Sequence, residues 1–189
     1  IQINPNNTVK LFCPNPEFGQ NVMTSLPMIT AEELDIPWEN VTVEMASHDA
    51  IKYGFQFTGG SQSMRAYWKP LRQAGAAARL MLRQAAAQTW GVSVESVRAE
   101  KGHVTHESGK KATYGEMASV AATLAVPKDV PLKSTQDFTI VNHSQKNVEG
   151  QKVVTGKPLF GIDYSVPGMR IAMIQHPPAF GMTLASFDA

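Results

Sequence analysis

Apolar residues in the first 46 positions follow two different periods. The run VKLFC (9–13) comes after the turn-forming NPNN, and ENVTVEMA (39–46) alternates apolar with polar positions, so both are predicted to be strands. Between them, apolar residues recur at helical spacing over 22–34, which predicts a helix. The intervening stretch 14–21 is rich in Pro, Asn and Gly and is predicted to be a loop. The chain therefore opens with strand, loop, helix and strand.

The strongest helical signal covers residues 61–90. One face carries an apolar stripe made of Leu71, Ala74, Ala78, Leu82 and Ala85. Another face carries arginines seven residues apart, namely Arg65, Arg72 and Arg79. Pro70 is expected to divide the stretch into two parts, and Gly91 is well placed to cap its C-terminal end.

A hairpin and a capped helix are predicted next. SVRAE (96–100) and GHVTH (102–106) are expected to pair around a turn at Lys101 and Gly102. Thr113 and Glu116 have the spacing of a capping box, so a helix should begin there, and Pro127 is expected to end it. The first helix also contains Glu32 and Glu33, interpreted as surface charges because acidic residues are seldom fully buried.

These elements predict an α+β protein. Residues 1–145 are expected to form a two-layer domain with helices packed on a mixed β-sheet. After a connection punctuated by prolines, a second unit is expected over 151–189, with short β-like runs between Gly and Pro turns. Because its strands would have unpaired edges, we expect the chain to self-associate through this unit.

The composition is that of an ordinary globular protein. Hydrophobic residues make up 43% and charged residues 17%, and the formal net charge of +1 favours neither nucleic acid nor a polybasic membrane contact. The single cysteine, Cys13, excludes an internal disulfide and is interpreted as a small buried hydrophobe. The opening IQINPNNTVK has neither Met nor a basic signal region, so we expect an excised segment whose targeting information is missing. Localisation, whether periplasmic or cytoplasmic, stays open.

Two loops are candidates for ligand binding. Glu17-Phe18-Gly19-Gln20 joins a strand to a helix, where backbone N–H groups and an amide side chain can face an anion or an oxo group; the alternative is a simple turn. Thr58-Gly59-Gly60-Ser61-Gln62-Ser63 leads into the long helix. Its glycines allow close approach of a ligand, its hydroxyls can bind one, and Arg65 can pair with a phosphate. The alternative is an N-capping loop with Ser61 as the cap.

The order of these motifs resembles a known family. EFGQ, AEELDIPWENVTVE, TGGSQS, LRQAGAAARLML, TYGEMASVAATLAVP, VPLK, KVVTGKPLFGID and VPGM occur in the order found in molybdopterin-binding large subunits of the xanthine oxidase superfamily. The isoquinoline 1-oxidoreductase and membrane-bound aldehyde dehydrogenase type is the most similar, and the resemblance covers nearly the whole chain. It identifies 151–189 with the beginning of an α/β hammerhead-like domain.

The resemblance implies roles for individual residues. Gln20, after Gly19, matches the glutamine that approaches an apical molybdenum ligand. The second loop resembles the segment whose small residues contact the molybdenum centre and the pterin, and Gly59, Gly60 and Ser61 match it. Together with the hydroxyls and the guanidinium noted above, the predicted cofactor-binding residues are Gly19, Gln20, Thr58, Gly59, Gly60, Ser61, Ser63 and Arg65. Where the family usually has Glu-Met-Gly-Gln-Gly, this chain has Phe18 and Asn21. Asn tolerates the left-handed region better than most residues, so the turn is expected to survive.

The resemblance also implies an activity for the parent protein. Such enzymes oxidise an N-heteroaromatic ring or an aldehyde with water as the oxygen source, hold molybdopterin cytosine dinucleotide, and pass electrons to an iron–sulfur small subunit. The family's catalytic base is a glutamate near the end of a longer polypeptide, and no glutamate here matches it, so no catalytic residue is assigned. We therefore expect the segment alone to be inactive and to bind no cofactor.

Other interpretations remain. The chain could instead be an interaction or scaffold module that keeps the fold without the chemistry. His103 and His106 lie three residues apart in a predicted strand or turn, a poor geometry for a metal site. Trp38 and Trp68 are interpreted as core residues rather than as the lining of a substrate channel.

Overall fold

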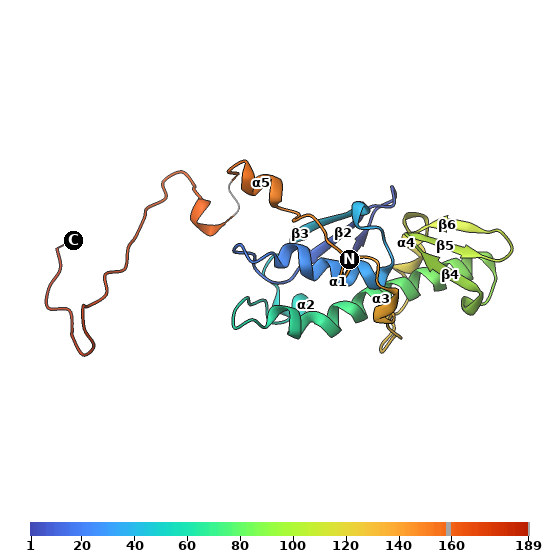
Figure 1. The fold of residues 1–189 in the computed structure, drawn as a ribbon, viewed down its shortest axis with the longest axis horizontal. Coiled ribbons are helices and arrows are strands. Elements are labelled where there is room, and N and C mark those ends of the chain that lie inside the picture. The colour runs from blue at the N-terminus through green and yellow to red at the C-terminus, as the bar shows by residue number, and fades with distance from the viewer. Residues whose placement is uncertain (158–159, 189) are drawn as a thin grey trace. The chain divides into compact units, whose positions relative to one another are not determined.

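The computed structural model describes residues 1–157 and 160–188. The chain divides into one compact unit, Ile1–Lys157, and a second short unit, Pro158–Ala189. Within the described residues, no helix combines the length and the apolar composition needed to cross a bilayer. The predicted α+β class is confirmed, although the strands form two small sheets rather than one (Figure 1).

The first sheet contains β1 (Gln2–Ile3), β2 (Val9–Cys13) and β3 (Val41–Met45) in that order. β1 is antiparallel to β2, whereas β2 and β3 are parallel, with Val9 opposite Val41 and Cys13 opposite Met45. Parallel neighbours need a crossover connection, and α1 (Val22–Leu34) provides it. The predicted strands, the predicted helix and the mixed character of this sheet are thus confirmed.

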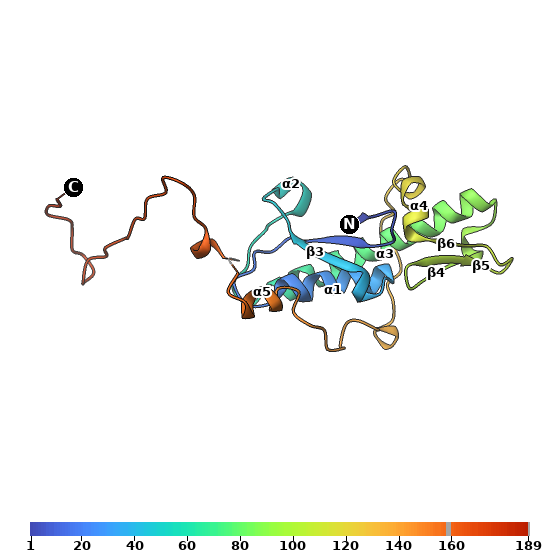
Figure 2. The same ribbon diagram turned by 90° about the horizontal axis from the view of Figure 1, so that it is seen from above.

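Helix α1 lies between this sheet and α3 (Ser63–Trp90), as Figure 1 shows, and Figure 2 shows the same elements from above. All residues of α1 are buried except Ser25 and Met28. The two helices run in the same direction, because the start of α3 lies by the loop before α1 while Glu33, near the end of α1, reaches Arg72 and Arg79.

Glu32 and Glu33 are not surface charges, and that prediction is wrong. The two side chains are 1% and 0% exposed. Glu33 pairs with Arg72 at 2.7 Å and lies 3.8 Å from Arg79. Glu32 accepts hydrogen bonds from three consecutive backbone N–H groups, those of residues 139–141. Burial is possible because every charge has partners, which offsets its loss of water.

Gly75 allows the close contact between the two helices. A Cβ atom on this residue would lie 2.4 Å from the carbonyl oxygen of Thr30 and 2.8 Å from Cβ of Glu33. We therefore predict that Gly75→Ala lowers the free energy of unfolding by about 1–3 kcal/mol, because backbone must move to admit the methyl group. Urea denaturation of the chain measures this loss.

Gly150→Ala is the matched control for that experiment. Gly150 also lies in a helix, α5 (Gly150–Val154), but its added Cβ would meet only Cβ of Asn147, at 3.6 Å. This variant should be neutral or slightly more stable, because Ala favours a helix more than Gly does. Equal losses in the two variants would contradict the packing argument.

α3 is one continuous helix, so the expected division at Pro70 is wrong. The proline removes a hydrogen bond to the carbonyl of Ala66, but both residues are exposed and water can satisfy that oxygen. Gly91 ends the helix with φ of 69°, as predicted. Beyond α1, the helix continues to a second sheet at its C-terminal end, where Arg83 donates to the carbonyls of Val94 and Val97.

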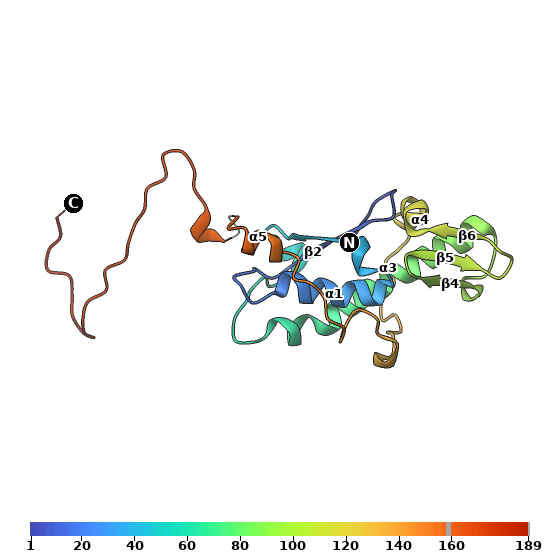
Figure 3. The same cartoon turned by 45° about the horizontal axis from the view of Figure 1, so that its top comes forward.

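This second sheet is an antiparallel meander of β4 (Val97–Glu100), β5 (His103–His106) and β6 (Lys111–Thr113). The predicted hairpin is confirmed: Lys101 and Gly102 form its turn, both with positive φ. α4 (Tyr114–Ala121) follows β6 and packs against α3 (Figure 3). Its predicted Thr113–Glu116 capping box is present, but the helix ends at Ala121, before Pro127 is reached.

Four 3-10 turns and one short helix complete the described elements. The turns are Trp38–Asn40, Val94–Ser96, Thr135–Asp137 and Gly161–Asp163, and α2 is Ala50–Tyr53. The described residues 160–188 contain no strand, and many of their apolar side chains are exposed. A strand needs a neighbouring strand as its hydrogen-bond partner, and no two segments within 160–188 pair in this way. The hammerhead-like identity of 151–189 and the self-association of the chain therefore stay predictions.

Candidate functional site

The two candidate loops lie side by side. The first loop, residues 14–21, joins β2 to α1, and the second, residues 54–62, leads into α3. Gln20 Nε2 donates to the carbonyl oxygen of Pro16 at 3.0 Å, and Thr58 Oγ1 donates to the same oxygen at 2.7 Å. Gln20 of the first loop therefore lies close to Thr58 of the second.

The first loop binds its own carboxylate. Glu17 Oε1 accepts from the backbone N–H groups of Gly19 at 2.7 Å and Asn21 at 3.0 Å, and Glu17 Oε2 accepts from that of Met23 at 3.0 Å. Glu17 thus occupies the N-terminal end of α1, where an external anion could otherwise bind. Asn21 has φ of 69°, so the left-handed turn expected despite the loss of Gly is present.

Gln20 is folded back onto its own loop. Its Oε1 accepts from the N–H of Phe18 at 2.8 Å, while its Nε2 donates to Pro16. The side chain is exposed, and an amide of this kind keeps one N–H and one lone pair for a further partner. Gly19, with φ of 111°, permits this tight turn.

The second loop has a backbone that few residues can adopt. Gly60 and Ser61 are both left-handed, with φ of 57° and 56°. A Cβ on Gly59 would lie 2.4 Å from the end of the exposed Phe57 ring, so a side chain at this position would require that ring to turn away. Ser61 does not cap α3, contrary to the capping alternative: Gln62 precedes the helix, and no side chain caps it.

The N-terminal end of α3 therefore differs from that of α1. Its first turn contains no acidic residue, and among residues 1–157 and 160–188 no side chain accepts from its first backbone N–H groups. Arg65 is exposed in this turn, and within the described residues no carboxylate pairs with it, whereas Arg72 and Arg79 are engaged by Glu33. Free donors, the positive end of the helix dipole and an available guanidinium together suit an anion.

One residue between the loops was not predicted. Asn15 is fully buried, and its Nδ2 donates to the Phe57 carbonyl at 2.6 Å and to Ser63 Oγ at 3.1 Å. Its Oδ1 is buried and has no hydrogen-bond partner within the described residues. The sequence gives little signal for this role, since Asn is common in turns.

The remaining candidates have structural roles. Burial raises the pKa of the Cys13 thiol to about 11, so it is protonated at neutral pH and its interpretation as a buried hydrophobe is confirmed. Trp68 is half-buried against apolar residues, as expected, whereas Trp38 is half-buried against the core and also lines the hollow described next. The described part of the chain contains no group of three or more His, Cys, Asp or Glu side chains that could hold a metal.

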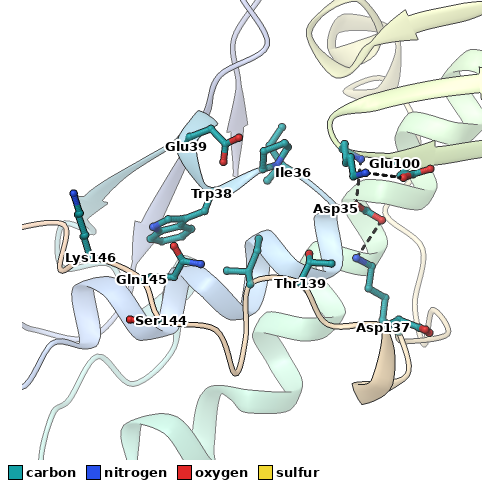
Figure 4. A pocket seen from close by; sticks show the side chains of 14 residues that line it. Asp35, Ile36, Trp38, Glu39, Glu100, Asp137, Thr139, Ser144, Gln145 and Lys146 are labelled. Atoms are coloured by element: carbon teal, nitrogen blue, oxygen red, sulfur yellow. Dashed lines mark hydrogen bonds and ion pairs between the residues drawn. The ribbon is translucent and has the colours of Figure 1, made fainter.

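A hollow lies at the other end of α1 (Figure 4). It measures about 810 Å³ and has Ile36, Trp38 and Ile140 among its apolar walls. Several of its charges neutralise one another, since Lys133 Nζ lies 3.1 Å from Asp35 and Lys101 Nζ lies 3.4 Å from Glu100. α1 rises about 20 Å over its length, so this hollow is separate from the two loops.

The chain is similar in sequence to one protein family and to several named proteins. The family model described as molybdopterin cofactor-binding domain matches residues 1–165. The beta subunit of isoquinoline 1-oxidoreductase from Brevundimonas diminuta is 30% identical over 228 residues, covering 100% of this chain and 29% of that protein. The membrane-bound aldehyde dehydrogenase (pyrroloquinoline-quinone) of Gluconacetobacter polyoxogenes is 28% identical over 193 residues, covering 98% and 25%. A nicotinate dehydrogenase subunit of Pseudomonas putida is 29% identical over 189 residues, covering 99% and 16%. The chain thus spans less than a third of each relative.

Proposed function

The chain belongs to the molybdopterin cofactor-binding domain family, and from that membership we propose that its two loops form part of the cofactor site of a molybdenum hydroxylase large subunit. The observation that carries the proposal is the N-terminal end of α3. Its donors are free of internal acceptors, while the equivalent donors of α1 are filled by Glu17. The second loop is therefore the part of the site that takes the anionic portion of the cofactor.

The residues present fit such a group. The left-handed backbone of Gly60 and Ser61 lets main chain approach a ligand closely. Ser63, the first residue of α3, and Arg65 supply a hydroxyl and a guanidinium to phosphate or pterin oxygens. The unpartnered Asn15 Oδ1 is a buried acceptor beside this loop, which is typical of a site that is completed by a ligand.

Gln20 would contribute hydrogen bonds from an uncharged amide. One amide N–H and one lone pair remain after its contacts with Phe18 and Pro16, so it can hydrogen bond to a neutral or weakly polar part of the cofactor. When bound, the molybdenum cofactor supplies the oxidation–reduction chemistry. The residues of this chain hold and orient it.

The activity of the whole protein is proposed from its relatives. Two of them are named for the heteroaromatic compounds isoquinoline and nicotinate, and one for an aldehyde. We propose the same substrate class, with water as the oxygen source, molybdopterin cytosine dinucleotide as the cofactor form and an iron–sulfur small subunit as the partner. The isoquinoline and nicotinate relatives are both named as subunits, which supports an assembly of several chains. The catalytic base would come from a part of the protein outside these residues.

Arg65→Ala tests this assignment in the full-length protein. We expect bound molybdenum per chain to fall about 10-fold, because a charged hydrogen bond to an oxyanion is lost at the end of α3. Elemental analysis of the purified protein measures this. Arg98→Ala is the matched control, since Arg98 is equally an exposed arginine but lies on β4, and it should retain the wild-type molybdenum content.

Unchanged molybdenum content in Arg65→Ala would show that Arg65 does not bind the cofactor. A full-length wild-type protein without molybdenum, folded and purified from cells that make the cofactor, would favour the scaffold alternative. The engaged amide of Gln20 is the observation that supports this alternative.

A further inference from the structure

Asn15 holds the Thr58–Ser61 segment of the second loop from both sides. Its amide nitrogen donates to the carbonyl oxygen of Phe57, just before the loop's Thr-Gly-Gly-Ser segment, and to Ser63 Oγ, just after it. The nearby carbonyl of Pro16 accepts from Thr58 Oγ1. Asn15 and Pro16, which follow β2, thus make three hydrogen bonds to Phe57, Thr58 and Ser63. Asn15 itself is fully buried.

The direction of these bonds matters for Ser63. Its oxygen accepts from Asn15, so its hydroxyl proton is left for another acceptor. A serine held in this way presents a donor at the start of α3, beside the free backbone N–H groups of the first turn. That arrangement selects for a ligand with acceptor oxygens.

A purely structural role does not account for the amide oxygen, Oδ1, of Asn15. A buried oxygen without a partner costs free energy, and buried polar atoms in folded proteins are nearly always paired. The amide nitrogen alone would stabilise the loop. The unpartnered oxygen is the second, independent feature that points to a site completed by a bound group.

We propose that Asn15 is a positioning residue of the cofactor site, which fixes the second loop and orients Ser63 toward the ligand. This inference rests on the proposed function. It assigns no contact between Asn15 and the reacting atoms, and its effect is exerted through Thr58–Ser63.

The test uses Asn15→Ala and Asn15→Asp in the full-length protein. The Asp variant keeps the size but replaces the donor with an acceptor facing the Phe57 carbonyl. Both variants should hold cofactor about 10- to 100-fold more weakly, as is typical when an outer partner of a metal site is lost. Molybdenum and released pterin are measured after dialysis. In cofactor-free protein, amide hydrogen exchange over 57–65 should also become faster.

Thr24→Val is the control for general destabilisation. Thr24 is 7% exposed, and its hydroxyl accepts from the Val148 N–H rather than from the second loop. It should lower thermal stability without reducing cofactor content. Ser63→Ala, at a half-buried position, provides a variant that folds even if the Asn15 variants do not, and it should weaken cofactor retention in the same direction.

Two results would overturn the inference. One is wild-type cofactor retention and wild-type exchange over 57–65 in the Asn15 variants. The other is a loss of cofactor that Thr24→Val reproduces at equal thermal stability. If the wild-type protein itself holds no molybdenum, the proposed function fails, and the exchange measurement still decides whether Asn15 positions the loop.

Discussion

Replacing Glu33 by Ala is expected to lower the free energy of unfolding by about 3–5 kcal/mol, because it leaves a buried guanidinium without its counter-charge. Arg72 is 9% exposed, and its Nε donates to Glu33 Oε1 at 2.7 Å. Glu33 Oε2 also accepts from the backbone N–H of Lys133 at 3.1 Å, so the connection after α4 loses an anchor as well. Urea denaturation, followed by circular dichroism, measures the change.

Lys10 and Glu44 provide the matched control for this pair. They lie 2.8 Å apart, but their side chains are 35% and 55% exposed. Water screens an ion pair of this kind, so Glu44→Ala should cost less than about 1 kcal/mol. A similar small effect in Glu33→Ala would show that Arg72 finds water or another partner when Glu33 is removed.

Glu32→Gln is expected to cost about 2–4 kcal/mol at pH 7, since hydrogen bonds to a charged acceptor are stronger than those to a neutral one. Glu32 Oε2 accepts from the N–H groups of Thr139, Ile140 and Val141 at 2.9, 2.7 and 3.0 Å, and Lys133 Nζ lies 3.3 Å from Oε1. Burial by itself raises the pKa of Glu32. The three N–H groups and the ammonium outweigh it and hold that pKa below its ordinary value.

The sign of the pH dependence follows from this lowered pKa. The charged form of Glu32 stabilises the fold, and its contribution is complete above the pKa of the unfolded chain, about 4.3. It is lost as the pH falls through the lower pKa of the folded state. The stabilities of wild type and Glu32→Gln should therefore differ most near neutral pH and converge below about pH 4.

Denaturation curves between pH 3 and 7 check this, with Glu107→Gln as an exposed control that should follow the wild type throughout. A constant difference between wild type and Glu32→Gln at every pH would contradict the explanation.

Local signals predicted the elements well. The β4–β5 hairpin needed only the Lys-Gly turn, and α4 needed only the Thr113–Glu116 box, because short-range hydrogen bonds and backbone preferences determine both. The end of α4 and the continuity of α3 through Pro70 were predicted wrongly. Both depend on packing and on access of water to a carbonyl group, which no local motif encodes.

The burial of Glu32 and Glu33 could have been inferred from the sequence. Apolar residues occur on every side of α1, for example Met23, Met28 and Ile29, so the helix has no face left for solvent. The seven-residue spacing of Arg72 and Arg79 places two guanidinium groups along one line of α3 to meet a carboxylate. The rule that acidic residues are seldom buried fails here because α1 has no exposed face.

The candidate site was predicted in part. The positions of the two loops followed from the order of the motifs. The sequence did not predict that Glu17 accepts from the backbone of the first loop, or that Asn15 donates to the second. Each contact depends on which of several donors and acceptors a side chain meets after folding.

The carboxylate of Glu17 at the N-terminal end of α1 has a consequence for selectivity among anions. Two open helix ends side by side would attract small anions such as phosphate and sulfate. Because Glu17 already accepts from the N–H groups at the start of α1, a small free anion can bind only to those of α3. A larger ligand that also offers a polar neutral group to the exposed amide of Gln20 engages both loops at once. The chain would thus discriminate by the size and the mixed polarity of its ligand rather than by charge alone.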